Sequence, residues 1–172
     1  MKSKCIIACC AGLFSVFSGA AYGDLPLAPQ FQVLDADDHS ISLNDLVGTP
    51  SILLYETRET TEQNRPLKET LKQLKQQGDV FRTVPIVDCS SASAFLKGIW
   101  KSQIREHSVK ENVDIYCDWT GAFGKAYQSS PNMSNVYIID PKGHIVYRNV
   151  GTVLKSDMPK IKLLLETPAA KD

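Results

Sequence analysis

Histidine and cysteine, the residues most often used for metal and thiol chemistry, are sparse in this chain of 172 residues. The three histidines, His39, His107 and His144, are scattered without the spacing of zinc ligands, so we expect no metal site and no cofactor. Three of the five cysteines lie in the first ten positions, and no Cys-x-x-Cys motif occurs after them. The missing motif argues against the commonest form of dithiol chemistry.

Long runs of a single charge are absent as well. No run of five or more basic residues occurs, which argues against nucleic acid as a partner. After residue 23 no segment is apolar enough to span a bilayer, so we expect no membrane contact once the first segment is removed. Residues 24–172 carry 17 basic and 19 acidic residues, a net charge of −2.

The first 23 residues have the pattern of a cleaved signal peptide. Lys2 and Lys4 provide the positive start, residues 5–18 are apolar, and Ala21-Tyr22-Gly23 fits a signal peptidase site. We therefore expect export to the periplasm and a single mature domain over 24–172. An uncleaved N-terminal anchor is the alternative, whereas a lipoprotein would need a cysteine at the position of Asp24.

The rest of the sequence alternates between strand and helix patterns. The expected elements are a β-hairpin over 31–43, strands over 51–55, 80–87, 113–117, 135–139 and 145–150, and helices containing 67–74, 95–100, 120–127 and 158–165. Pro85 cannot donate a ladder hydrogen bond, so we expect its strand to lack a complete neighbour there. Phe95, Ile99 and Trp100 are expected to face the core. The order predicts an α/β fold with a mixed sheet and helices on both faces.

Three stretches resemble the thioredoxin-like superfamily, specifically its redoxin branch of AhpC/TSA peroxiredoxins and TlpA-like reductases. They are FQVLDADDHSISLNDLVGTPSILLYE, DIYCDWTGAFGKAY and NVYIIDPKGHIVYRN. Within that superfamily the chain is most similar to YtfJ-type periplasmic proteins. The resemblance implies a three-layer sandwich, in which a mixed central sheet is flanked by helices and begins with an N-terminal β-hairpin.

The resemblance also shows where reactive thiols are missing. In reductases of this type the two cysteines would fall near Thr60 and Gln63, and a peroxiredoxin would place its attacking cysteine in the same turn. The family's cis-proline would fall near Ser134, and the nearest proline is Pro131.

Thr60 is a poor substitute for a nucleophilic cysteine, because a hydroxyl lacks the acidity of a thiol. Glu59 and Glu62 are near in sequence, but carboxylates are weak bases for a hydroxyl. The alternative is that Thr60 or Thr61 is a helix N-cap, with Glu62 or Gln63 completing a capping box. The surrounding charges could bind a polar ligand or simply form a solvated loop.

Cys89 and Cys117 are the two cysteines that remain beyond the leader, 28 positions apart. Each follows or ends a strand that the resemblance places side by side, so their separation permits a disulfide. Three possibilities stay open: a structural disulfide, two buried free thiols, or a redox-active pair. Neighbouring Asp88 and Asp118 would raise the thiol pKa values and weaken nucleophilicity, which counts mildly against catalysis.

Two function classes follow from these observations. The first is a non-catalytic periplasmic module that binds a protein or peptide partner through residues 56–65 and the loop before Asn135. The second is a thiol-disulfide oxidoreductase or antioxidant protein, active in redox homeostasis, that uses Cys89 and Cys117. A hydrolase has less support, since no set of nucleophile, base and orienting residue is recognisable.

Overall fold

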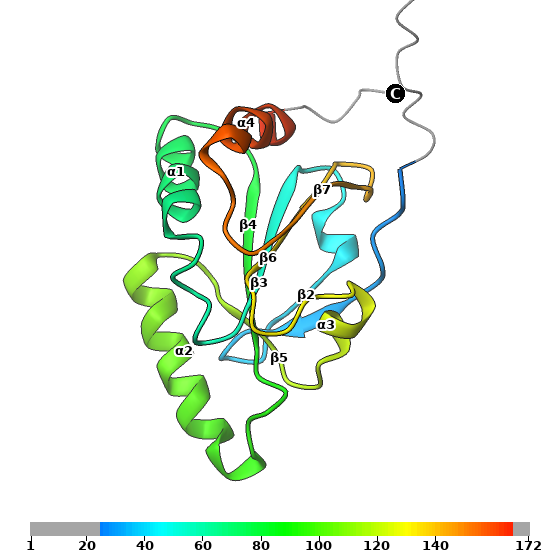
Figure 1. Cartoon of the computed structure of the whole chain (residues 1–172). Helices are drawn as coiled ribbons and strands as arrows, with labels where there is room; N and C mark the ends of the chain where they lie inside the picture. The colour runs from blue at the N-terminus through cyan, green and yellow to red at the C-terminus, as the bar shows by residue number, and fades with distance from the viewer. Residues whose placement is uncertain (1–24, 167–172) are drawn as a thin grey trace, which may run out of the picture.

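The computed structural model describes residues 25–166, so the expected leader and its cleavage site lie outside the described residues. A seven-stranded mixed sheet forms its centre, with strand order β2-β1-β5-β4-β3-β6-β7 (Figure 1). In chain order the strands are β1 (Gln32–Leu34), β2 (Ser40–Ser42), β3 (Ser51–Glu56), β4 (Arg82–Asp88), β5 (Tyr116–Asp118), β6 (Asn135–Ile139) and β7 (Ile145–Val150). The expected N-terminal hairpin is confirmed as the antiparallel pair β1–β2.

Strand β3 is the middle of the core, and all six of its residues are buried. It pairs in parallel with β4, where Leu53 lies opposite Val84, and antiparallel with β6, where Leu53 lies opposite Tyr137. An unbroken apolar strand is typical of a strand covered on both faces, so the interpretation of residues 51–55 is confirmed. The parallel β3–β4 pair is connected through α1 (Arg65–Gln76).

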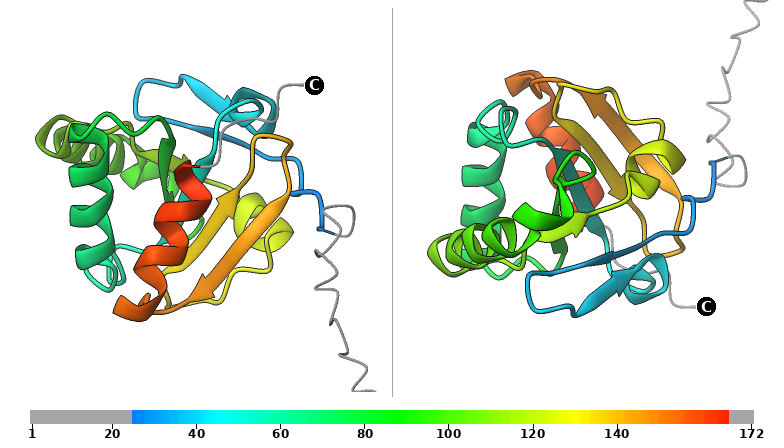
Figure 2. Two further views of the ribbon diagram at one scale, coloured as in Figure 1. Left: turned by 90° about the horizontal axis from the view of Figure 1, so that it is seen from above. Right: turned by 90° about the horizontal axis from the view of Figure 1, so that it is seen from below.

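Helices cover both faces of this sheet, as expected (Figure 2). One face packs against α1 and α4 (Met158–Glu166), through residues such as Leu71 and Ile161. The other face packs against the N-terminal hairpin and α3 (Ala122–Ala126), whose Phe123 is fully buried. Phe123 stacks on Tyr127 with 4.1 Å between ring centroids, so aromatic contacts hold the short α3 in place.

The expectation for Pro85 is confirmed. Strand β4 lies between β3 and β5, but β5 pairs only with Ile86, Val87 and Asp88. Pro85 therefore has a neighbour on the β3 side alone, where it lies opposite Leu54, and no β5 carbonyl needs the hydrogen bond that it cannot donate. Strand β5 is shorter than predicted and begins at Tyr116 rather than at Val113.

The interpretation of the second long helix was correct for Trp100 and wrong for Phe95 and Ile99. Helix α2 (Lys97–Glu111) follows a short 3-10 turn, η3 (Ala94–Leu96), and its only fully buried residue is Ile104. Phe95 is 91% exposed and Ile99 is 54% exposed, so neither faces the core. The inward face is instead set by Trp100 and Ile104, which are four residues apart and so lie on the same side of the helix.

The predicted turn between the last two strands is confirmed. The carboxylate of Asp140 is buried and accepts the backbone N–H groups of Lys142 (2.9 Å) and His144 (2.8 Å). Gly143 has a φ of +89°, a conformation that residues with a Cβ rarely adopt. This turn fixes the register between β6 and β7, and β7 then leads through η4 (Lys155–Asp157) into α4.

Candidate functional site

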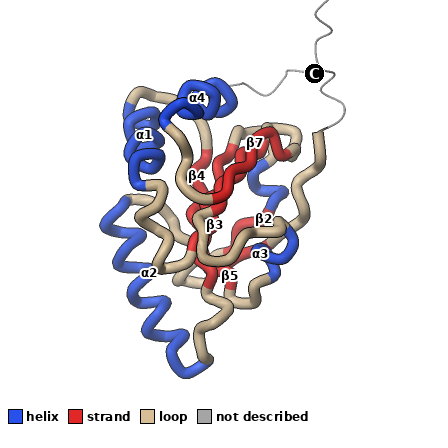
Figure 3. Tube along the Cα trace, viewed as in Figure 1, coloured by secondary structure: helices blue, strands red, loops and turns tan. Residues whose placement is uncertain are grey.

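The ends of four strands meet at one edge of the sheet. Strands β3, β4 and β5 run parallel and end at Glu56, Asp88 and Asp118, while the antiparallel β6 begins beside Tyr55 at Asn135. The loops that connect these ends to the helices occupy the lower half of the view in Figure 3. Open α/β sheets commonly bind ligands at this edge, which makes the side chains placed there the candidates for a functional site.

Glu56 is the first of these residues, and its carboxylate is buried. Lys68 on α1 donates a hydrogen bond of 2.6 Å to Glu56 Oε2 and another of 2.7 Å to the carbonyl of Thr61. Burial raises the pKa of Glu56 above its ordinary value, although Lys68 and Ser134 both act in the opposite direction. The ion pair therefore ties the end of β3 to α1 and to the loop between them.

Ser134 is fully buried and belongs to the same polar network. Its hydroxyl donates to Glu56 Oε1 at 2.8 Å and accepts from Asn64 Nδ2 at 2.8 Å. Its backbone N–H donates to Gln63 Oε1 at 2.9 Å. Because both sides of the hydroxyl are occupied, Ser134 is held as a structural connector and its oxygen does not reach solvent.

Asn64 links this network to the far end of β7. Its Nδ2 also donates to the carbonyl of Gly151 at 3.0 Å, and its Oδ1 accepts the backbone N–H of Val153 at 2.8 Å. One buried amide thus connects three segments that are distant in the sequence: the loop before α1, the loop before β6 and the segment after β7.

Thr60 lies in the turn where a reductase of this type would have its first cysteine, and it is buried. Its Oγ1 accepts the backbone N–H of Thr57 at 2.8 Å and donates back to the carbonyl of Thr57 at 3.2 Å. The prediction that Thr60 or Thr61 caps the helix was wrong, because α1 begins at Arg65 with Asn64 as its N-cap residue. The turn needs its own hydrogen bonds before the helix starts, and Thr60 supplies them.

The charged residues of the same loop face solvent. Glu62 is exposed and forms an ion pair of 2.6 Å with Arg65, and this pair lowers the pKa of Glu62 below its ordinary value. Glu59 is also exposed and has a lowered pKa, because its carboxylate accepts its own backbone N–H and a hydrogen bond from Thr57. Of the five predicted positions, the structure therefore brings together Gln63 and Ser134, while Glu59, Thr60 and Glu62 lie outside their network.

A depression of about 240 Å³ opens beside the network. Tyr55, Asp88, Ser90, Ser130, Lys125 and Met133 are among the residues that line it. Asp118 lies behind its wall and accepts hydrogen bonds from the Tyr55 hydroxyl (3.3 Å) and from the backbone N–H of Gly124 (3.1 Å). Burial and the charges of Asp118 and Asp88 raise the pKa of Tyr55, so this hydroxyl stays protonated and remains a hydrogen-bond donor.

Gly124 has a steric reason to be glycine at this wall. A Cβ at position 124 would lie 2.5 Å from the Tyr55 hydroxyl, which is closer than non-bonded atoms approach. Met133 forms an exposed apolar rim of the depression, and its methyl group lies close to Gly151. The rim and the depression together offer apolar contacts next to hydrogen-bonding groups.

Cys89 and Cys117 are both free thiols and both buried, on the side of the sheet edge covered by α2. The backbone N–H of Cys89 donates to the carbonyl of Asp118 at 3.1 Å, which places the two cysteines side by side. A hydrogen bond with Cys117, together with burial, raises the pKa of Cys89. The structure thus brings this predicted pair together in a dry environment that suppresses the thiolate of Cys89.

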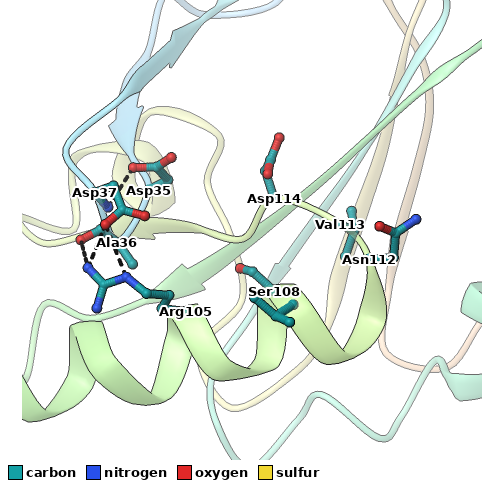
Figure 4. Close-up of a pocket in the computed structure, with 9 residues that line it drawn as sticks. Asp35, Ala36, Asp37, Arg105, Ser108, Asn112, Val113 and Asp114 are labelled. Carbon is teal, nitrogen blue, oxygen red and sulfur yellow. Dashed lines mark hydrogen bonds and ion pairs between the residues drawn. The ribbon is translucent and has the colours of Figure 1, made fainter.

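A second depression, of about 450 Å³, lies between the β1–β2 turn and α2 (Figure 4). Its exposed carboxylates include Asp37, which Arg105 holds with Nη2 at 2.6 Å while also bonding the carbonyl of Ala36 at 3.1 Å. These side chains satisfy one another and lie away from the converging strand ends. The region therefore attaches α2 to the hairpin, and we do not assign it as the candidate site.

The chain spans nearly the full length of several solved thioredoxin-type structures. The exposed lipoprotein thioredoxin Etrx1 of Streptococcus pneumoniae matches with a TM-score of 0.62 at 19% identity, covering 80% of this chain and 99% of that one. This protein has a thioredoxin-like fold. The mixed sheet and flanking helices of the predicted three-layer sandwich are confirmed.

Two further structures give the same result. A thiol:disulfide interchange protein of the thioredoxin family from Chlorobium tepidum matches with a TM-score of 0.61 at 16% identity, covering 82% of this chain and 97% of that one. The thioredoxin domain of a thiol-disulfide oxidoreductase from Bacteroides vulgatus matches at 0.58 with 17% identity, covering 81% and 96%. No family model and no curated protein matches the sequence. At these identities the similarity establishes the fold, and function has to be argued from the site.

Sequence reasoning missed Glu56, Asn64 and Lys68, which form most of the network. The available signal was Glu56 itself, an acidic residue that directly continues a fully apolar strand and so has to be partnered. Within residues 25–166, no group of three or more His, Cys, Asp or Glu side chains is arranged to hold a metal ion. No helix in that range has the length and apolarity needed to cross a membrane.

Proposed function

We propose that this protein is a non-catalytic periplasmic binding module that holds a peptide or protein partner at the strand edge next to Ser134. The observation that carries the proposal is the network of Glu56, Asn64, Lys68 and Ser134. It adjoins the turn of Thr60 and Gln63, where the resemblance places the cysteines of thiol-dependent relatives, and its polar atoms are already bonded to one another. The site keeps a surface for recognition and lacks a group that could react.

The proposed contact surface combines two features. Met133 exposes an apolar side chain at the rim, and apolar side chains exposed next to polar ones are common in protein interfaces. The depression beside them presents the Tyr55 hydroxyl, the Asp88 carboxylate and the Lys125 ammonium group, which can pair with the backbone and polar side chains of a peptide. A partner would lay an apolar side chain on the rim and direct polar groups into the depression.

Export supports a periplasmic setting for such a module. The N-terminal sequence has the pattern of a signal peptide, and one of the solved structures with this fold is described as an exposed lipoprotein thioredoxin. The YtfJ-type resemblance agrees with this location. The intact mass of the purified protein is expected to equal that of a chain beginning at Asp24. A mass that includes residues 1–23 would contradict the proposal of export with cleavage.

The decisive test has two parts. Purified protein is expected neither to reduce insulin nor to consume peroxide above the background rate, and an appreciable rate of either would refute the proposal. Site-specific photo-cross-linking at Met133 is expected to give a discrete adduct with a periplasmic partner. The same probe at Val80, which is 80% exposed and distant from the strand edge, should give none.

A second candidate function is thiol-disulfide exchange through Cys89 and Cys117. The observation in its favour is that the two thiols lie side by side, and several solved structures with this fold are described as thiol:disulfide interchange proteins or oxidoreductases. Burial of both thiols and the raised pKa of Cys89 work against rapid exchange. Any redox activity that persists unchanged in a Cys89→Ser variant would exclude this candidate.

A further inference from the structure

The segment between Cys89 and Cys117 is held to the rest of the domain by few contacts. It contains η3 and α2, and α2 buries only Ile104 fully. Trp100 is partly buried, whereas Phe95 and Ile99 point into solvent. A helix of 15 residues with so little apolar burial gains little from packing, so other interactions have to keep it in place.

Ion pairs to the hairpin provide part of that attachment. Lys101 pairs with Asp38 at 2.5 Å. Arg105 pairs with Asp37 at 2.6 Å, as Figure 4 shows. Both pairs have at least one well-exposed partner, and exposed ion pairs contribute little stability. These contacts orient α2 without holding it firmly.

The two cysteines lie at the two ends of this weakly held segment. Cys89 comes directly after β4, and Cys117 is the middle residue of β5. Their parallel strands are paired, with Val87 opposite Cys117, and the Cys89 backbone N–H reaches the Asp118 carbonyl. Cys89 is two positions beyond the residue opposite Cys117, and the side chains of the two cysteines are close enough to hydrogen-bond to each other. A disulfide needs such close neighbours.

The surroundings of the thiols are also suited to a stable bond. Ala36 and Ile104 complete the buried cluster, and Trp100 and Trp119 pack against it. Neither sulfur is exposed to solvent, so a disulfide formed here would be protected from attack by external thiols. The same burial means that the bond forms while α2 is open or during folding.

From these contacts we infer that Cys89 and Cys117 are a modification site, at which a disulfide joins the end of β4 to β5 and closes the loop that contains η3 and α2. The inference does not depend on the proposed binding function. It differs from redox catalysis because the bond, once covered by α2, does not turn over.

The reaction needs an oxidant, and a disulfide-bearing molecule such as oxidised glutathione can supply it. The thiolate of one cysteine attacks the oxidant's disulfide, forms a mixed disulfide and releases one thiol. The other cysteine then loses its proton and attacks the sulfur of the first, which releases the second thiol. In total the two cysteines lose two electrons and two protons, and the oxidant's disulfide becomes two thiols.

The test compares oxidation of the same pair in the folded and the unfolded chain. The protein is equilibrated with mixtures of reduced and oxidised glutathione, once after refolding and once in concentrated guanidinium chloride, and then alkylated. Peptide mapping assigns the bond to Cys89 and Cys117 and separates it from any bond involving Cys5, Cys9 or Cys10. A disulfide that fits the native structure is expected to raise the oxidation equilibrium constant about 100-fold or more in the folded chain.

An equal or smaller constant in the folded chain would overturn the inference, because it would show that the native geometry resists the bond. A second measurement covers the effect on α2. Amide hydrogen exchange over 97–111 is expected to slow roughly 10-fold in the oxidised protein relative to the reduced protein. A Cys89→Ala/Cys117→Ala double variant is the control and should show no difference between the two conditions. Equal exchange rates over 97–111 in the oxidised and the reduced wild-type protein would show that the bond does not restrict the opening of α2.

Discussion

The strand ends on the two sides of this site are built from different side chains, although they lie at the same edge of one sheet. A buried polar network lies at the ends of β3 and β6. Its members Glu56, Ser134 and Asn64 all form hydrogen bonds through their side chains. At the ends of β4 and β5, Cys89 and Cys117 lie in an apolar cluster under α2. The first region is cross-linked by hydrogen bonds, and the second is covered mainly by one loosely packed helix.

The difference shows that a thioredoxin-like fold forms here with hydrogen-bonded polar residues near Thr60 and Gln63, and with its two cysteines at positions 89 and 117. Side-chain hydrogen bonds join the loops around the network and hold them in position. The cysteines occupy a neighbouring position, where burial makes the Cys89 thiol a poor nucleophile. The network thus contains no thiol, and the neighbouring Cys89 thiol is kept protonated while its hydrogen bond lowers the pKa of Cys117.

The largest effect is expected from Asn64→Ala in the polar region. This change removes the acceptor of the Val153 backbone N–H and the donor to the Ser134 hydroxyl. Buried polar groups that lose a hydrogen-bond partner destabilise the folded state. We expect a loss of about 3 kcal/mol in the free energy of unfolding, measured by chemical denaturation. Gln73→Ala, on the exposed side of α1, is the control and should change stability little. A loss as small as that of the control would mean that the network contributes little.

The matching change in the apolar region is Ile104→Ala. It removes the only fully buried residue of α2, and truncation of a buried isoleucine costs about 2 kcal/mol or more. Because α2 has few other buried contacts, we expect much of this effect to be local, as faster amide exchange over 97–111 with little change over β3. Val109→Ala is the exposed control on the same helix. Equal acceleration of exchange in β3 would show that α2 and the sheet unfold as one unit.

A smaller effect is expected from Glu56→Gln. Glutamine keeps an oxygen that can accept from Ser134 and removes a carboxylate that is costly to bury, but it loses the charge that pairs with Lys68. We expect a net loss of about 1 kcal/mol, and a double-mutant cycle with Lys68→Met should show coupling between the two positions. Glu69→Gln is the exposed control on α1. Additive effects in the cycle would show that the ion pair is not a stabilising contact.

The smallest effect concerns pH and lies in the hairpin that anchors α2. The carboxylate of Asp35 bonds His39 and raises the pKa of the imidazole above 6.5. The folded state therefore binds this proton more tightly than the unfolded state does. Its contribution to stability is complete below pH 6.5 and disappears as the pH rises through the folded pKa. An NMR titration of His39 should show the raised value, and Asp35→Asn should return it to the ordinary range; an unchanged value in that variant would exclude Asp35 as the cause.

The sequence alone predicted most of the sheet and little of the network. Residues 51–55 and 135–139 are uninterrupted apolar runs, and the segment 140–143 combines proline and glycine in an order typical of a turn, so these elements are encoded locally. Gln63 and Ser134 were predicted only as positions that match the family's motif. The partners Asn64 and Lys68 could not be predicted, because their hydrogen bonds join segments about 70 or more residues apart or cross from a helix to a strand end.

Local pattern determined where this chain forms strands and helices, because the period of apolar residues is a property of neighbouring positions. It also determined that the usual thiol pair is absent from the turn before α1. Only the tertiary structure decided that Trp100 faces inward together with Ile104 and not with Phe95 and Ile99, since apolar spacing alone allowed either grouping. It also brought Cys89 beside Cys117 and Asn64 beside Ser134, because contacts between distant segments depend on how the strands pair, and no local pattern records that pairing.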